Sequence, residues 1–322
     1  MMDGTQRVID YLRISVTDRC NLRCVYCMPA EGVEWQPHDK ILRYEEILRL
    51  CKICAGLGVT KYKLTGGEPL VRKGLADLVA GIKAIPGTKS VTITTNGILL
   101  AGQLPGLVAA GLDGVNISLD TLDAGRFAAI TRGGRVEQVL EGLEAALAQP
   151  GLNVKLNCVP TGENDRELAA LAALAKDRPL AVRFIELMPI GLGEPARGRT
   201  ETQIRALLEA AYGPMEPYDV PLGNGPCRYV SLPGFAGKIG FISAMSHKFC
   251  DRCNRVRLTA AGFLKTCLQY ETGVDLRPLL AGDDAALAGA IADAVIHKPA
   301  AHQFGSAAVD RTEGRMMSQI GG

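Results

Sequence analysis

The sequence predicts an α/β protein built as a partial (β/α)6 barrel of the TIM type, open on one side. Short β-branched runs alternate with amphipathic segments rich in alanine and leucine from the N-terminus to about residue 190. Six such units are fewer than the eight that close a barrel. After residue 195 the alternation stops, so the rest of the chain is expected to form an extension that covers the open side.

Six β-branched runs are the expected strands of a parallel sheet. They lie at 11–16, 59–64, 90–95, 115–119, 153–159 and 181–187. Helical segments between them are expected at 44–55, 75–84, 135–148 and 165–176. Repeated alternation of strand and helix favours a parallel sheet whose faces are covered by helices.

Two domains are expected, a barrel core at 1–195 and a C-terminal extension at 196–322. Within the extension, 199–212 has a helical pattern. The segment 218–237 is rich in proline and glycine and is expected to be irregular, and a hairpin is expected near Gly262.

Composition restricts the class of protein. With 322 residues, of which 47% are hydrophobic, the chain can bury a full core. A net charge of +2 and 5% aromatic residues argue against a nucleic-acid surface. No apolar run is long enough to cross a bilayer and no signal core opens the sequence, so we expect a cytoplasmic protein without a membrane partner.

A first cysteine motif follows the first expected strand. Cys20, Cys24 and Cys27 form a CxxxCxxC pattern. Three closely spaced thiolates suit a cubic iron-sulfur cluster, whereas a structural zinc site takes four ligands. The missing fourth thiolate leaves one iron with an open coordination site. Three cysteines that only pack in the core are the alternative, which this spacing disfavours.

This motif, placed after the first strand of a partial barrel, resembles that of the radical S-adenosylmethionine (SAM) superfamily. Thr65-Gly-Gly-Glu-Pro69 resembles the GGEP segment of the same superfamily. The resemblance implies that SAM binds the open iron of a [4Fe-4S] cluster and is cleaved to a 5'-deoxyadenosyl radical. The positions that it matches to SAM contacts are Tyr26, Gly67, Ser118 and Met188.

A second cysteine motif lies near residue 250. Cys250 and Cys253 form a CxxC unit, and Cys267 follows after thirteen residues. A zinc knuckle is the alternative to a second iron-sulfur site. The stretch 241–268 and the terminal Gly321-Gly322 resemble the MoaA-type GTP 3',8-cyclases of molybdenum cofactor biosynthesis. That resemblance implies a second [4Fe-4S] cluster whose open iron binds the guanine of GTP.

GTP carries about four negative charges, which require cationic partners. The resemblance implies substrate contacts at Arg13, Lys63, Thr94, Lys155, Arg255, Val256 and Arg257, and further basic positions around the triphosphate at Lys61 and Arg183. Alternation places Lys61 and Lys63 on one face of a strand. The family more often has arginine at the position of Lys63. Catalytic roles are implied for Arg255, Arg257, the two terminal glycines and the first three cysteines.

The implied reaction converts GTP to (8S)-3',8-cyclo-7,8-dihydroguanosine 5'-triphosphate. A cyclic pyranopterin monophosphate synthase would consume this product, flavodoxin or ferredoxin would supply electrons, and a homodimer is the family's expected state. Two other functions stay open on the sequence alone. One is a peptide-modifying radical enzyme with an auxiliary cluster, and the other is a non-catalytic iron-sulfur electron carrier or zinc-stabilised binding protein.

No part in the reaction is assigned to the cysteines outside the two motifs or to the histidines near the C-terminal end. Cys51 and Cys54 lie at helical spacing among apolar residues, which favours packing. Cys158 and Cys227 have no assigned role. The two histidines of the HKPAAH segment, His297 and His302, are expected to be structural.

Overall fold

A computed structural model describes residues 1–193, 198–304 and 313–321. It contains one twelve-stranded sheet in the order β12-β11-β10-β1-β2-β3-β4-β5-β6-β9-β8-β7. The sheet curves into a barrel. This barrel stays open, because its two edge strands, β12 and β7, do not pair with each other. The six expected strands are confirmed as its parallel centre: β1 (Tyr11–Ser15), β2 (Lys61–Thr65), β3 (Ser90–Thr95), β4 (Gly114–Ser118), β5 (Asn153–Cys158) and β6 (Ala181–Ile185).

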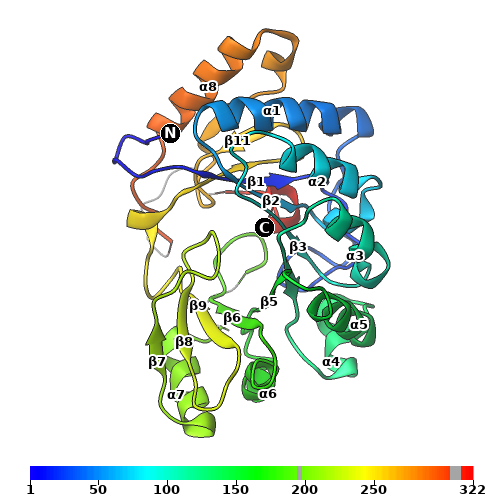
Figure 1. The fold of residues 1–322 in the computed structure, drawn as a ribbon, viewed down its shortest axis with the longest axis vertical. Coiled ribbons are helices and arrows are strands. Elements are labelled where there is room, and N and C mark those ends of the chain that lie inside the picture. Colours follow the sequence, from blue (N-terminus) through cyan, green and yellow to red (C-terminus); the bar gives the residue numbers. More distant parts are fainter. Residues whose placement is uncertain (194–197, 305–312, 322) are drawn as a thin grey trace.

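Helices cover the outside of the barrel (Figure 1). The expected ones are α1 (Tyr44–Gly56), α2 (Leu75–Lys83), α5 (Val136–Leu147), α6 (Leu168–Ala173) and α7 (Glu201–Tyr212). Three more are α3 (Leu100–Ala109), α4 (Ala124–Thr131) and α8 (Asp284–Ile296), which the sequence pattern did not reveal. Helix α6 is shorter than expected at both ends, because a separate 3-10 turn at Asp165–Glu167 precedes it and residues 174–176 form turns.

The C-terminal part of the chain extends the sheet at both edges. Strand β9 (Lys238–Ile242) pairs in parallel with β6, followed outward by β8 (Arg228–Ser231) and β7 (Glu216–Tyr218). Strand β10 (Arg255–Leu258) pairs in parallel with β1, followed by β11 (Phe263–Lys265) and β12 (Gly273–Asp275). The hairpin near Gly262 is therefore confirmed. The expectation of irregular structure throughout 218–237 is wrong, because β8 forms within it by pairing with β9.

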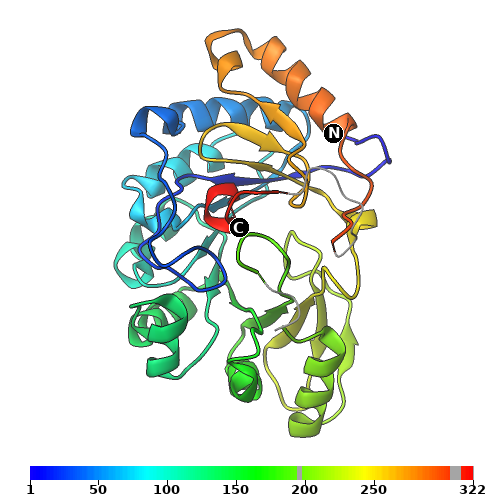
Figure 2. The same ribbon diagram turned by 180° about the vertical axis from the view of Figure 1, so that it is seen from behind.

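A short last helix brings the C-terminal end back to the barrel. Helix α9 (Met317–Ile320) lies near the centre of the molecule, against the strands (Figure 2). The expected domain boundary after residue 195 falls outside the described residues, so the division into two domains stays a prediction. Among the described helices, none has the length and apolar character needed to cross a membrane.

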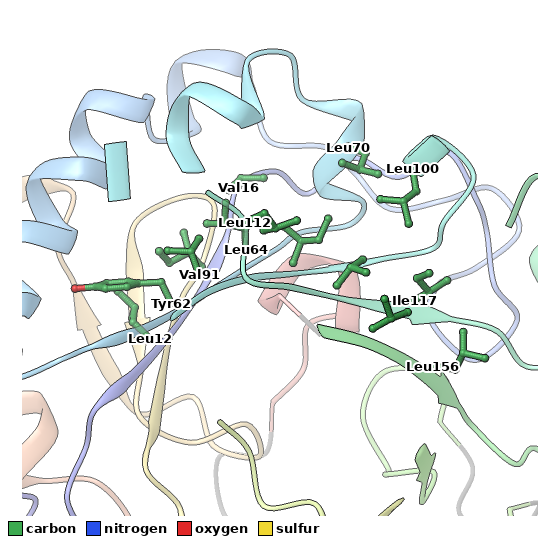
Figure 3. Close-up of a cluster of buried hydrophobic side chains, with 14 of the residues drawn as sticks. Leu12, Val16, Tyr62, Leu64, Leu70, Val91, Leu100, Leu112, Ile117 and Leu156 are labelled. Carbon is green, nitrogen blue, oxygen red and sulfur yellow. The ribbon is translucent and has the colours of Figure 1, made fainter. Parts of the chain in front are cut away.

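Side chains on one face of the strands pack in a hydrophobic core beneath the helices, and those on the other face line a polar barrel interior. Leu12, Tyr62, Val91 and Ile117 are buried in the hydrophobic core (Figure 3). Successive side chains of a strand point to opposite faces. The residues between these apolar ones therefore face the inside of the barrel, and many of them are arginine, lysine, threonine or asparagine.

Candidate functional site

The interior of the barrel is a cavity of about 670 Å³, and side chains from both cysteine motifs line it. Its walls also include the inward-facing residues of the strands. The expected site residues in the lining are Arg13, Cys20, Cys24, Tyr26, Cys27, Lys63, Gly67, Thr94, Ser118, Lys155, Arg183, Met188, Cys250, Cys253, Arg255, Arg257 and Cys267. Segments that are far apart in the sequence thus meet in one pocket.

Three cations lie side by side on adjacent strands. Strand pairing sets Arg13 of β1 directly beside Arg257 of β10 on one side and Lys63 of β2 on the other. Burial and the neighbouring positive charges lower the pKa of Lys63 well below its usual value. The pKa of Arg257 is also held well below its usual value, first by burial and then by Arg13 and Arg255. Like charges in register are unfavourable, so an anionic ligand is the natural complement of this row.

The opposite wall carries a second pair of cations. The guanidinium of Arg183 donates to Asn157 Oδ1, and Lys155 Nζ donates to Asn153 Oδ1 over 2.6 Å. Burial, followed by the charge of Arg183, lowers the pKa of Lys155 to about 7. Thr94 accepts a hydrogen bond of 3.4 Å from Asn116. This wall therefore offers cations and neutral polar groups, with Lys155 poised to gain a proton when an anion approaches.

The first cysteine motif is fixed by close packing against the GGEP segment. The backbone N–H of Gly67 donates to Thr17 O over 2.7 Å, and that of Glu68 donates to Arg19 O over 2.8 Å. A Cβ on Gly67 would lie 2.4 Å from Arg19 O. The glycine is thus required by contact between two protein segments, whereas the sequence suggested only an approach to a ligand.

Glu68 joins the ends of β2 and β3 beneath this motif. Its buried carboxylate accepts hydrogen bonds from Leu70 N, Thr95 Oγ1 and Asn96 N. Burial raises its pKa to about 7 despite those bonds. Asn96 in turn reaches the motif, because its Nδ2 donates to Asn21 Oδ1 over 2.8 Å. Glu68 therefore acts as a positioning residue for the first cysteine motif.

Tyr26, inside the first motif, contacts a carboxylate that the sequence did not single out. Its hydroxyl donates to Asp120 Oδ2 over 2.6 Å. Asp120 follows β4 and also accepts from Val159 N, and burial raises its pKa to about 6. Ser118, two residues earlier, lines the same part of the cavity. The position of Asp120 directly after a strand was the available signal, since functional side chains gather at the carboxyl ends of parallel strands.

The donor chemistry of both motifs fits iron-sulfur clusters. All ten cysteines are free thiols, and the six motif cysteines are only partly buried. Burial, then the charge of Cys20, raises the pKa of Cys27 to about 12. Burial also acts on Cys253, but Lys298 and Arg255 outweigh it and lower its pKa to about 7. Iron binding displaces such protons, because thiolates are the ligands of these clusters. No group of three metal-binding side chains in the described part of the chain is arranged for a single metal ion.

The two motifs lie at opposite ends of the barrel strands. Cys20 follows Ser15, the last residue of β1, by five positions. Cys253 precedes Arg255, which pairs with Tyr11 at the start of β1. A five-residue strand spans roughly 15 Å. The row of Arg13, Lys63 and Arg257 lies between the motifs and is positioned to hold a ligand that reaches from one end toward the other.

The C-terminal tail contacts the end of the barrel that carries the first cysteine motif. The Arg257 guanidinium donates to Gly321 O over 3.1 Å. Gly321 has φ 74, a left-handed conformation that favours glycine. A Cβ there would lie 3.0 Å from Ser15 Cβ and 3.1 Å from Thr65 Oγ1, at the ends of β1 and β2. Gly322 lies outside the described residues.

Two expected substrate residues do not line the cavity. Lys61 lies at the start of β2, where its ammonium pairs with Asp10 at 2.7 Å. Val256 is on the core face of β10, buried with Leu258, because alternation directs its neighbours Arg255 and Arg257 inward. The sequence also missed residues that do line the cavity, namely Asn116, Asn157, Tyr229, Lys298 and His302.

Two family models match the chain. The model described as Radical SAM superfamily matches residues 14–175, and the model described as Molybdenum Cofactor Synthesis C matches residues 180–304. The first covers the barrel up to α6, and the second covers β6, the added strands and the second cysteine motif.

Curated relatives are similar over their full length. A protein of Pelotomaculum thermopropionicum named GTP 3',8-cyclase is 50% identical over 329 residues, and one of Moorella thermoacetica with the same name is 48% identical over 328 residues. Each alignment covers 100% of both chains. Among solved structures, Streptococcus suis SuiB has a TM-score of 0.59 at 14% identity, covering 90% of this chain and 67% of that chain. At such low identity this likeness shows the fold alone.

Proposed function

The chain belongs to the family of GTP 3',8-cyclases within the radical SAM superfamily, and from this premise we propose how its cavity carries out that reaction. The substrate is GTP and the product is (8S)-3',8-cyclo-7,8-dihydroguanosine 5'-triphosphate, the first intermediate of molybdenum cofactor biosynthesis. Membership of the superfamily implies one [4Fe-4S] cluster and bound SAM. The second cluster and the roles of individual residues are our proposal.

Cys20, Cys24 and Cys27 would hold the first cluster, which with SAM supplies the carbon radical. Tyr26, Gly67, Ser118 and Met188 line the same cavity as these thiols and would hold SAM. Asp120 fixes the Tyr26 hydroxyl, and Glu68 with Asn96 fixes the loop that carries Cys20. These contacts keep the site in place before any ligand enters.

Cys250, Cys253 and Cys267 would hold the second cluster at the other end of the barrel, where the guanine base of GTP would bind. The observation that carries the proposal is the row of Arg257, Arg13 and Lys63 in register between the two motifs. Together with Lys155 and Arg183, these cations would bind the triphosphate and hold the ribose toward the first motif. Arg255, directly beside the second motif, would contact the substrate there. The walls of the barrel would limit the access of water to the reactive carbon radical.

The wider setting is part of the same proposal. A reduced flavodoxin or ferredoxin would supply electrons, and a cyclic pyranopterin monophosphate synthase would consume the product. The protein would act in the cytoplasm as a homodimer.

The test is an anaerobic assay of reconstituted protein with dithionite, SAM and GTP, in which 5'-deoxyadenosine and nucleotide products are followed by mass spectrometry. We expect both 5'-deoxyadenosine and the cyclised nucleotide. Cys253→Ala should lower the iron content from about eight to about four atoms per chain and stop cyclisation. The matched control is Cys51→Ala, whose thiol packs in α1 and should leave the iron content unchanged. Cleavage of SAM without a nucleotide product would contradict the proposed substrate.

A further inference from the structure

Beside the first cysteine motif, the outer surface carries an exposed tryptophan stacked with arginines. Trp35 is 45% exposed. The guanidinium carbon of Arg19 lies 5.1 Å from the centre of its ring, and that of Arg23 lies 5.8 Å from it. A tryptophan that serves only the core is largely buried, so this one is available to a partner.

Hydrogen bonds attach this surface rigidly to the motif. The Arg23 guanidinium donates to Cys20 O and Leu22 O, over 2.8 and 2.9 Å. Arg132, from the turn after α4, donates to Arg23 O and Met28 O. The loop that carries Trp35 is held by its next residue, because Gln36 N donates to Asp18 Oδ2 over 2.6 Å. We call Arg19, Arg23, Trp35 and Arg132 the arginine-tryptophan patch.

The arginines of the patch are not neutralised by local ion pairs. None of the three lies within 4.0 Å of a carboxylate oxygen in the described part of the chain. Nearby arginines differ, since Arg126 pairs with Glu167 and Arg135 with Glu137. Glu31 and Glu34 are exposed on the same loop but bind none of the patch arginines. The patch thus combines positive charge that no carboxylate neutralises in the described part of the chain with an exposed aromatic ring, the composition enriched at protein interfaces.

We propose that the arginine-tryptophan patch is the docking surface for an acidic electron-carrier protein that reduces the first iron-sulfur site. The inference rests on the proposed cluster at Cys20, Cys24 and Cys27. Arg19 adjoins Cys20, and Arg23 lies inside the motif and donates to Cys20 O, so a carrier bound here lies next to the first motif. The carrier gives up one electron, and the site accepts it. Charge complementarity selects an acidic carrier and speeds its encounter.

The test measures reduction of the reconstituted protein by stopped-flow absorbance, with reduced flavodoxin as one reductant and dithionite as the other. In the double variant Arg19→Glu, Trp35→Ala, we expect the flavodoxin-driven rate at low salt to fall about tenfold. The dithionite-driven rate should not change, because dithionite is small and needs no docking surface. Salt should slow the flavodoxin reaction of the parent protein and have little effect on that of the variant.

The matched control is Lys52→Glu, an equal change of charge at an exposed position on α1. Equal flavodoxin-driven rates in the control and the patch variant would overturn the proposal. The proposal would also be overturned if the patch variant sedimented differently from the parent protein while its flavodoxin-driven rate stayed unchanged. The patch would then be a contact between two copies of the chain. If Arg19→Glu lowers the iron content, the comparison of Trp35→Ala with Trp35→Phe decides, because only the alanine variant should lose rate.

The binding of oxidised flavodoxin, measured by calorimetry, separates this proposal from the proposed reaction. Binding that the patch variant weakens supports the docking surface even if GTP is not converted. The opposite outcome is that the parent protein converts GTP with dithionite but binds flavodoxin no more tightly than the patch variant. That result would overturn the docking surface and leave the proposed reaction intact.

Discussion

Lys155 lies beside the cation Arg183 on the inner wall of the cavity, and this arrangement links GTP binding to proton uptake. Its pKa of about 7 results first from burial and then from Arg183. Bound triphosphate favours the charged ammonium and raises that pKa. At pH 8 the side chain is mostly neutral before binding and charged afterwards, so a proton enters with GTP.

We therefore predict that GTP affinity falls as pH rises from 7 to 9, by at most about tenfold per pH unit from this group. Calorimetry at pH 8 in two buffers of different ionisation enthalpy measures the proton uptake. Lys155→Arg should show less uptake, because arginine stays charged. Equal uptake in both proteins would assign the proton to another group, such as Lys63.

Local spacing identified residues that the structure brings to one cavity. The two cysteine motifs line it, and alternation correctly directs Arg13 and Lys63 inward, whereas the cluster-binding role of the motifs stays a prediction. Lys61 shares their face of the sheet, yet its place at the start of β2 brings it to Asp10 instead of the cavity. Asp120 was missed because its partner Tyr26 is 94 residues away, and no local pattern shows such a contact.

The GGEP turn is the element that holds the first cysteine motif, and Gly67 is its tightest point. Gly67→Ala would place a methyl group 2.4 Å from Arg19 O, which forces the two segments apart. We predict that this variant loses the first cluster and keeps the second, so the iron content falls to about four atoms per chain. Iron analysis and electron paramagnetic resonance measure this loss. Gly102→Ala in α3 is the control, because its Cβ would meet no atom within 4 Å. A full iron content in Gly67→Ala would show that the turn can move without loss of the motif.

The terminal helix α9 and its glycine form a second positioning element. Gly321→Ala costs about 1 kcal/mol for the left-handed backbone alone, and the new methyl group would crowd Ser15 and Thr65. We predict that product formation falls about tenfold or more while iron content is retained, because the tail contacts Arg257 and carries no cluster ligand. The measurement is turnover against iron content, with Gly289→Ala in α8 as the control. Normal turnover of Gly321→Ala would show that the seated tail is dispensable.

Elements with strong local periodicity were predicted within one or two residues at most ends, as in β3 and α7. Helix α3 was not predicted because Gly102, Pro105 and Gly106 weaken its helical pattern. Strand β8 was not predicted for a different reason. It lies in a segment rich in proline and glycine and forms through pairing with β9, which tertiary structure decides and local sequence does not.

At the scale of the whole molecule, the added strands make the barrel and the extension one sheet. β10 lies beside β1 although Arg13 and Arg257 are 244 positions apart, and β9 lies beside β6. The sequence predicted the open barrel but not these pairings, because nothing local specifies which distant strand joins an edge. The same pairings carry Arg257 and the second cysteine motif to the start of β1, so completing the sheet also completes the site.

A fragment of residues 1–195 should therefore fail to behave as an independent domain. It would leave both β1 and β6 as unpaired parallel edges, although in the full chain each is covered by a partner strand over four or more residue pairs. Long uncovered edges promote aggregation. We predict that the fragment is insoluble or oligomeric, whereas the full chain sediments as a defined species. Adding residues up to 258 should not rescue it fully, since β10 would then become an edge in place of β1. A soluble fragment that unfolds cooperatively and retains the first cluster would show that the six central strands are stable alone and that the extension serves the substrate only.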